Sequence, residues 1–192
     1  MNEGCYGGWP VFNGYFAENA HMVTNECAPD LATTSGDRCS NYEKCSAFAK
    51  VQKTYFVGKG YGDSTEYNMM KEILRNGAIT GEIEFTQSMA SYTSGIISAS
   101  GLIELKKSLA QDINDKNFED QGIDNVTISH SIVVLGWGVD KSSNTKYWIL
   151  RNSYGDDWGE KGDFKVKRGT NDFGIESLSS GYDVLLCENG GC

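Results

Sequence analysis

The sequence predicts an α+β protein in which a loop-rich, cysteine-rich first part precedes a β-rich second part. Residues 1–50 are rich in glycine and contain four of the six cysteines. After Lys50 the apolar residues alternate with polar ones, mostly at a period of two, which is typical of strands in an antiparallel sheet or barrel. We therefore expect two regions, 1–50 and 51–192, with the sheet in the second.

Two helices and a strand are predicted before the main sheet. Residues 11–20 are expected to form a short helix and residues 54–57 a strand. Residues 63–66, DSTE, have the spacing of a capping box, so an amphipathic helix should begin there and end at Gly77. Its apolar side is expected to carry Tyr67, Met70 and Leu74, with Met69 and Ile73 beside them.

The β-rich part contains several apolar segments of strand length. Residues 79–85 and 164–167 alternate between apolar and polar, whereas residues 132–135 and 146–150 are runs typical of buried strands. Residues 101–117 interrupt this pattern with leucines at helical spacing in a stretch rich in Lys and Asp. This segment predicts a surface helix inserted between strands.

Composition narrows the class of partner and cofactor. The formal net charge of −9 argues against binding to a nucleic-acid backbone, which requires clustered Lys and Arg. No apolar run approaches the ~20 residues that span a bilayer. The only histidines are His21 and His130, and no C-x-x-C pair occurs, so a zinc site is poorly provisioned. No motif implies another metal or an organic cofactor, and we expect neither. His21, in a polar loop, is expected to be structural.

The cysteines indicate an oxidising compartment. An even number of them in Gly- and Asn-rich loops predicts disulfides, and the glycosylation sequon at residues 125–127 points the same way. Cys187 and Cys192 are close enough in sequence to pair with each other. Residues 1–5 have neither the basic start nor the apolar stretch of an export signal, so we expect a processed or truncated piece of a secretory-pathway glycoprotein.

One histidine and one asparagine stand where catalysis is plausible. His130 begins an apolar strand, and Asn152 follows the next strand 22 residues later. Adjacent antiparallel strands with this separation would bring the two side chains together. An Asn oxygen that accepts a proton from one imidazole nitrogen leaves the other nitrogen facing a nucleophile, which is the arrangement of a Cys-His-Asn system. Taken alone, a histidine before a strand is more often structural than catalytic, and Asn152 is compatible with an ordinary turn.

Three blocks around these residues resemble the papain family of cysteine peptidases. Residues 4–10, GCYGGWP, are similar to that family's Gly-Cys-Asn-Gly-Gly loop, and residues 130–138, HSIVVLGWG, to its His-Ala-Val-Leu-Ala-Val-Gly-Tyr-Gly block. Residues 147–155 and 158–162 are similar to its Tyr-Trp-Ile, Asn-Ser-Trp-Gly and Trp-Gly-Glu-Gly series. Their order and spacing match over nearly the whole chain. The resemblance implies a papain-like two-lobe fold, with the remainder of the helical left lobe before an antiparallel β-barrel right lobe.

Within the family the nearest pattern is that of cathepsin X, also called cathepsin Z, a lysosomal carboxypeptidase. The similar segments are residues 67–79 (YNMMKEILRNGAI), 92–96 (YTSGI) and the cysteine-rich 39–45 (CSNYEKC). Residues 173–177, FGIES, resemble a block near the end of several cathepsins. This resemblance implies a lysosomal, vacuolar or extracellular location and a peptide or protein substrate, and it leaves exopeptidase and endopeptidase action open.

The resemblance also implies roles for single residues. His130 would be the general base and acid, and Asn152 would orient it. The implied substrate-binding residues are Gly7, Gly8, Trp9, Pro10, Ser129 and Trp158. The glycine pair would let the substrate backbone approach closely, Trp9 and Pro10 would line the pocket for the second residue upstream of the cut bond, and Trp158 would pack on the other side of that bond. The alternatives are an ordinary turn for the glycines and ordinary core packing for Trp158.

The nucleophile of the family is not recognisable in this sequence. In the family it opens a long helix upstream of the loop matched by residues 4–10, preceded by a Gln, and none of the six cysteines has that context. Cys5 matches a position that forms a disulfide with a cysteine just before the nucleophile. We therefore expect an N-terminal chain or segment of the same protein to supply the catalytic Cys, and this chain alone to be inactive.

Two classes of function remain, a cysteine peptidase and a catalytically inactive papain-like structural or binding subunit. Tyr154 stands where the family has a Trp that covers the His–Asn hydrogen bond, and Phe173 stands where several cathepsins have Cys. The insert at residues 101–117 would reshape the cleft or serve as a docking surface. The presence of both His130 and Asn152 favours the peptidase.

Overall fold

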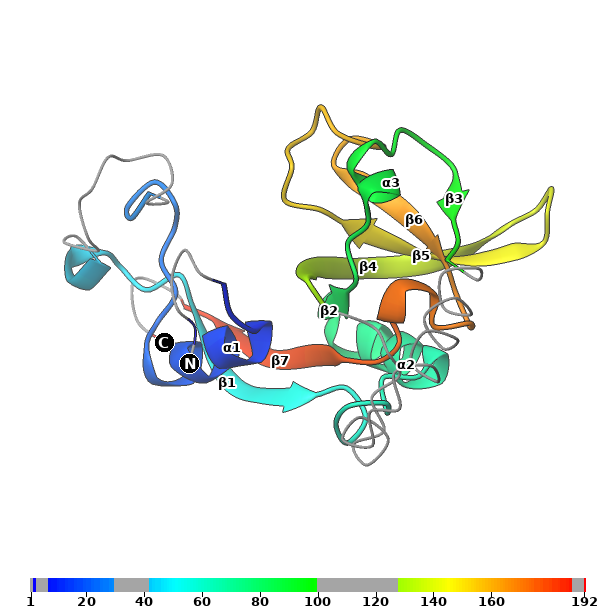
Figure 1. Cartoon of the computed structure of the whole chain (residues 1–192). Helices are drawn as coiled ribbons and strands as arrows, with labels where there is room; N and C mark the ends of the chain where they lie inside the picture. Colours follow the sequence, from blue (N-terminus) through cyan, green and yellow to red (C-terminus); the bar gives the residue numbers. More distant parts are fainter. Residues whose placement is uncertain (1, 3–6, 30–41, 100–127, 188–191) are drawn as a thin grey trace, which may run out of the picture. The chain divides into compact units, whose positions relative to one another are not determined.

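The computed structural model forms two compact units, Met1–Tyr55 with Tyr182–Cys192, and Phe56–Gly181 (Figure 1). The residues that it describes are 2, 7–29, 42–99, 128–187 and 192. The helix predicted at 101–117 and the sequon at 125–127 lie outside this part of the chain. None of the helices within it is long and apolar enough to cross a membrane.

The first unit is built around helix α1 (Pro10–Asn19) and strand β1 (Ala49–Phe56), with β1 beside β7 (Ser179–Leu186). Pro10 occupies the first helical turn, where its missing N–H costs no hydrogen bond. Gly14 faces β1 so closely that a Cβ atom there would lie 2.5 Å from Thr54 Oγ1. The helix predicted at 11–20 is thus present, shifted by one residue.

A disulfide and a carboxylate join the segments of this unit. Cys27 and Cys45 form a disulfide next to the short 3-10 helix η2 (Tyr42–Lys44). The Glu18 side chain of α1 accepts a hydrogen bond from the Thr54 backbone N–H of β1 at 2.5 Å. Cys187 and Cys192 also form a disulfide, as expected from their proximity, whereas Cys5 and Cys39 lie outside the described residues.

The second unit is a sheet in the order β7-β2-β4-β5-β6-β3. The strands not yet placed are β2 (Ile79–Ile83), β3 (Ile96–Ile97), β4 (His130–Asp140), β5 (Thr145–Arg151) and β6 (Asp163–Lys167). All of the neighbouring pairs are antiparallel except β3 with β6, which run parallel. Short helices α3 (Gln87–Ala90) and η3 (Asp172–Gly174) lie in the connections.

The core of this unit is aromatic and aliphatic, and it lies on one face of the sheet. Its fully buried members include Trp148, Phe164 and Val134, which come from three adjacent strands. Its buried residues are Val57, Met69, Ile79, Ile83, Met89, Tyr92, Ala99, Ile132, Val134, Trp148, Leu150, Phe164, Val166, Phe173 and Ile175. The alternating patterns predicted at 79–85 and 164–167 therefore place their apolar residues correctly on the inner face.

Helix α2 (Glu66–Asn76) packs against β2 and β4 (Figure 1). Its N-cap is Thr65, whose hydroxyl oxygen accepts a hydrogen bond from the Asn68 N–H at 3.3 Å, which satisfies one of the free donors of the first turn. Gly77 ends the helix with φ +89°, a conformation that glycine adopts at little cost. The predicted end is confirmed, and the helix begins at the last residue of the predicted box.

The buried face of α2 differs from the predicted one. Tyr67 and Leu74 are 70% and 77% exposed, whereas Met69 is fully buried and Met70 and Ile73 pack against the core. The sequence is compatible with burial of Tyr67, Met70 and Leu74 or of Met69, Met70 and Ile73, because both sets repeat at helical spacing. Glu66, the first residue of the helix, also forms an ion pair with Arg168.

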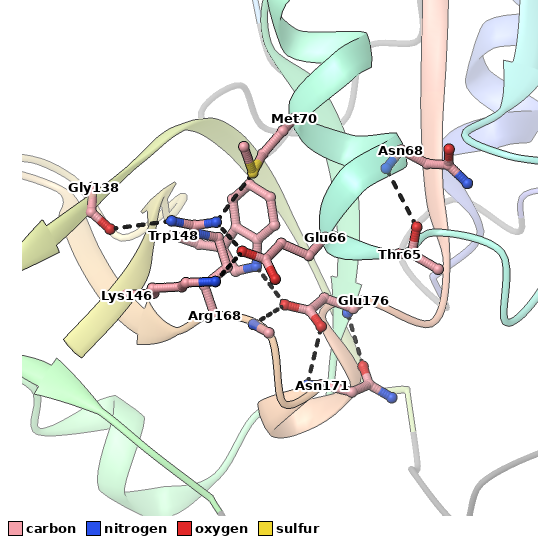
Figure 2. Close-up of polar contacts among 11 residues, drawn as sticks. Thr65, Glu66, Asn68, Met70, Gly138, Lys146, Trp148, Arg168, Asn171 and Glu176 are labelled. Carbon is pink, nitrogen blue, oxygen red and sulfur yellow. Dashed lines mark hydrogen bonds and ion pairs between the residues drawn. The ribbon is translucent and has the colours of Figure 1, made fainter. Parts of the chain in front are cut away.

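That ion pair belongs to a cluster centred on Arg168, which follows β6 (Figure 2). The guanidinium pairs with Glu66, contacts the Met70 sulfur at 3.0 Å and stacks over the Trp148 ring at 5.4 Å. It also donates to the Gly138 carbonyl at 3.5 Å. The Arg168 side chain is only 5% exposed, so this buried cation joins α2 to strands β4 and β5.

Glu176 closes the other side of the same cluster (Figure 2). Its carboxylate accepts hydrogen bonds from Trp148 Nε1 at 3.0 Å and from the backbone N–H groups of Gly169 and Asn171 at 2.6 and 3.1 Å. In return, the Asn171 side-chain oxygen accepts from the Glu176 N–H at 2.8 Å. The loop that follows β6 is therefore fixed to the buried Trp148.

Candidate active site

His130 is the first residue of β4 and lies opposite Ile83 of β2 in the antiparallel register. The residue before it, Ser129, donates its N–H to the Ile83 carbonyl at 3.0 Å. The Ser129 hydroxyl accepts a hydrogen bond from the Phe85 N–H, also at 3.0 Å. These hydrogen bonds between the end of β2 and the start of β4 thus fix the backbone next to His130.

Asn152 directly follows β5, and its N–H donates to the Gly162 carbonyl at 2.9 Å. Because β4 and β5 are antiparallel neighbours, the end of β5 lies beside the start of β4. Asn152 Oδ1 lies 2.8 Å from His130 Nε2, and Asn152 is 7% exposed. The strand pairing inferred from the sequence brings these two side chains into contact.

The orientation of the Asn152 amide decides which imidazole nitrogen carries the proton. The Ser153 N–H donates to Asn152 Oδ1 at 2.8 Å, so the oxygen of the amide is on that side. An oxygen can only accept from His130, and Nε2 is therefore the donor nitrogen. In the described part of the chain Nδ1 of this ring makes no hydrogen bond and can accept a proton there.

Aromatic rings surround the imidazole. The ring centroids of Phe85 and Tyr154 lie 4.8 and 5.8 Å from that of His130, and 5.6 Å from each other. Trp158 lies 5.7 Å from Tyr154, and its Nε1 donates to the Ala90 carbonyl at 3.0 Å. The indole of Trp158 packs partly against the core, so it reaches the site through Tyr154.

The other candidate substrate-binding residues belong to the first unit. Gly7 has φ +96° and Trp9 is 42% exposed, with its N–H donating to the Asn2 side-chain oxygen at 2.7 Å. Pro10 begins α1. These residues and Gly8 thus lie in one unit, whereas Ser129, His130, Asn152 and Trp158 lie in the other.

Sequence reasoning missed Phe85 as a residue of the site, and it also missed Glu82, a buried carboxyl on the neighbouring strand β2. Phe85 was expected only as an alternating strand residue, and its place beside His130 depends on a strand register that spacing does not fix. Glu82 lies opposite Ser131, is 4% exposed, and accepts a hydrogen bond from that hydroxyl at 2.9 Å. Burial raises the pKa of the Glu82 carboxyl to about 7.

Across the described residues, no group of three His, Cys, Asp or Glu side chains is placed to hold a metal ion. The chemistry that the site itself offers is proton transfer at His130 Nδ1. The nucleophile would then lie against that nitrogen.

Comparison with known proteins places this geometry in a family. A family model described as papain family cysteine protease matches residues 1–182. The chain is 29% identical over 186 residues to cathepsin C of Schistosoma mansoni, covering 96% of this chain and 38% of that protein. It is 32% identical over 194 residues to cathepsin Z of Onchocerca volvulus, covering 96% and 53%. The chain therefore spans about half the length of these relatives, or less.

Solved structures give the same fold. The bromelain protease from Ananas comosus superposes with a TM-score of 0.71 at 21% identity, covering 95% of this chain and 72% of that one. A digestive procathepsin L 3 of the Tenebrio molitor larval midgut superposes with a TM-score of 0.69 at 22% identity, covering 94% and 50%. The fold is thus papain-like, an α+β architecture with a largely antiparallel sheet.

Proposed function

The chain belongs to the papain family of cysteine proteases, and we propose that it is the part of a cysteine peptidase that supplies the general base His130 and its orienting residue Asn152. The observation that carries this proposal is the 2.8 Å contact between His130 Nε2 and Asn152 Oδ1, with the amide turned by Ser153. This contact sets the imidazole in the tautomer that a cysteine nucleophile requires.

The reaction follows from that tautomer. His130 Nδ1 takes the proton of a cysteine thiol, and the thiolate attacks the carbonyl carbon of a peptide bond. The C–N bond breaks as the imidazolium returns its proton to the leaving amine, which leaves a thioester. Water then attacks the thioester while Nδ1 accepts its proton, and that proton passes to the departing sulfur. Asn152 keeps the ring oriented throughout, because its oxygen accepts from Nε2 in both protonation states.

We propose that the nucleophilic Cys comes from a segment outside this sequence. Four of the six cysteines are in the disulfides Cys27–Cys45 and Cys187–Cys192. Within the first unit, α1 exposes three aromatic side chains to a degree that is unusual for a packed helix, namely Phe12, Tyr15 and Phe16 at 39%, 44% and 66%. A further segment of the same protein that packs on α1 would cover them.

Some finer parts of the proposal rest on the resemblance to cathepsins. The substrate is a peptide or protein, and carboxypeptidase action is the form suggested by the cathepsin X pattern. The two disulfides fit a lysosomal, vacuolar or extracellular location. Gly7, Gly8, Trp9, Pro10, Ser129 and Trp158 remain our candidates for substrate contacts.

The test uses the natural mature protein together with any polypeptide that co-purifies with it. An active-site-directed thiol reagent, followed by non-reducing and reducing mass spectrometry, locates the labelled cysteine. We expect the label on a peptide outside this sequence and peptide hydrolysis that falls at least ~100-fold in His130→Ala, since general acid–base groups contribute about that much or more. His21→Asn is the matched control and should retain activity, because His21 belongs to the first unit and stacks on Tyr42. Absence of both labelling and hydrolysis would favour the inactive binding subunit instead.

A further inference from the structure

Phe85 is held beside His130 by the sheet. It lies two residues beyond Ile83, the register partner of His130. The Phe85 N–H donates to the Ser129 hydroxyl, and the Ser129 N–H donates to the Ile83 carbonyl, each at 3.0 Å. These bonds join the backbone of Phe85 to the residue that precedes His130. The backbone of Phe85 is thus fixed by the same strand pair that fixes the backbone of His130.

Tyr154, the other ring near His130, is less firmly held. It lies in the segment after β5 and is 49% exposed, whereas Phe85 is partly buried and packs against the core of the second unit. The Phe85 centroid is also the nearer one, at 4.8 Å against 5.8 Å. Gly155, next to Tyr154, has φ +83°, which places the tyrosine at a turn. The ring that makes the closer and more rigid contact with the imidazole is therefore Phe85.

The imidazole needs such a contact, because a ring torsion of this kind has broad minima and one hydrogen bond fixes it only in part. A hydrogen bond that is shielded from water is also stronger than an exposed one. We propose that Phe85 is a positioning residue for His130, which holds the imidazole against Asn152 and excludes water from the bond between Nε2 and Oδ1. Its effect on catalysis rests on the function proposed above, but its effect on this bond does not.

The first test measures the hydrogen bond directly. The protein has two histidines, so the Nε2–H proton of His130 is assignable by NMR after ¹⁵N-histidine labelling, with His21→Asn as the assignment control. We expect slow exchange of this proton with water in the wild type and at least ~10-fold faster exchange in Phe85→Leu, because the shielding ring is gone. Tyr154→Leu should change the exchange rate less. Phe85→Tyr, which keeps the ring, should restore slow exchange.

Clear outcomes overturn the proposal. Fast exchange in the wild type, unchanged exchange in Phe85→Leu, or a larger effect of Tyr154→Leu would each do so. If Phe85→Leu does not fold, Phe85→Met, whose unbranched side chain adapts better to the space left by the ring, takes its place in the same comparison. The second test is kinetic, with kcat expected to fall ~10-fold or more in Phe85→Leu while KM stays within about twofold. Should the wild type lack peptidase activity, the proposed function fails, and the exchange measurement still decides the role of Phe85.

Discussion

The Arg168 cluster and the His130 site both place a nitrogen-rich side chain against aromatic rings in the second unit, but they differ in how fully they are paired. Arg168 meets Glu66, Met70, the Gly138 carbonyl and the face of Trp148, and only its Nε is buried without a partner among the described residues (Figure 2). The first region is closed by groups of its own unit, and we expect removal of one of these groups to destabilise that unit.

The His130 site is closed on one side only. Nε2 is bonded to Asn152, whereas Nδ1 has no hydrogen-bond partner in the part of the chain that the structure describes. Within the same residues, Asn152 Nδ2 is buried and unpaired. A buried unpaired polar group costs about 1–3 kcal/mol, and each region contains one such atom, Arg168 Nε in the first and Asn152 Nδ2 in the second. The two regions therefore differ in the unpaired Nδ1 of His130, which can take part in proton transfer. The difference indicates which region is kept for structure and which for chemistry.

Alanine substitution of one asparagine in each region is expected to give the largest difference between the two regions. In the assembled peptidase, Asn152→Ala should lower kcat/KM by ~100-fold, because the imidazole loses its orienting acceptor. Asn171→Ala, in the other region, should leave kcat/KM within about twofold and lower the free energy of unfolding by about 1 kcal/mol. Steady-state kinetics and urea denaturation of both variants make the test. An activity loss in Asn171→Ala equal to that in Asn152→Ala would remove the distinction.

Substitution of Arg168 should change the free energy of unfolding more than the peptidase activity. Arg168→Met should lower the free energy of unfolding by roughly 3–4 kcal/mol, because Glu66 loses its buried partner and Trp148 its stacked cation. The measurement is urea denaturation followed by tryptophan fluorescence. Activity per folded molecule should remain near that of the wild type. Unchanged stability would show that this buried cation does not hold α2 in place.

Glu82 should make the stability of the second unit depend on pH. It is a buried carboxyl opposite Ser131, the residue that follows His130 in the sequence. Its pKa is raised from 4.5 to about 7 in the folded state, so the folded protein binds the proton more tightly than the unfolded chain. The contribution of Glu82 to the free energy of unfolding should therefore be highest below about pH 4.5. It should fall by roughly 2–3 kcal/mol as the pH rises to about 7.

The measurement is urea denaturation at several pH values for the wild type and Glu82→Gln. The variant keeps the shape of the side chain but cannot ionise. Its free energy of unfolding should therefore not decrease in this way between pH 4.5 and 7. Parallel profiles for the two proteins would show that Glu82 is not the group responsible.

The smallest expected effect is at the exposed edge of the Arg168 cluster. Lys146 Nζ lies 3.2 Å from Glu66, but its side chain is 56% exposed. Exposed ion pairs contribute little, so Lys146→Ala should lower the free energy of unfolding by ~0.5 kcal/mol or less, and less still in high salt. Chemical denaturation at two salt concentrations is sufficient. A loss close to that of Arg168→Met would mean that the charge alone, and not its burial, carries the cluster.

The sequence predicts the local features of both regions better than their distant contacts. Helix α2 and its stop at Gly77 follow from capping and turn chemistry, and the contact of His130 with Asn152 follows from two consecutive strands. Both are decided within about 25 residues of chain.

Contacts across long sequence separations were not predictable. Glu66 and Arg168 are 102 positions apart, and neither their ion pair nor the exposure of Tyr67 and Leu74 on the same helix follows from local spacing. The parallel pairing of β3 with β6 and the place of Phe85 beside His130 likewise depend on strand order and register. The contact between His130 and Asn152 was thus predictable from the sequence, and the position of the Phe85 ring beside His130 was not.

The Cys27–Cys45 disulfide has a consequence for how the protein is produced. It closes a loop of 18 residues in the first unit, and a loop of this length contributes about 3 kcal/mol by restricting the unfolded chain. The second unit, with His130 and the Arg168 cluster, does not contain this bond. We therefore expect recombinant material made in a reducing cytosol to have a less stable first unit.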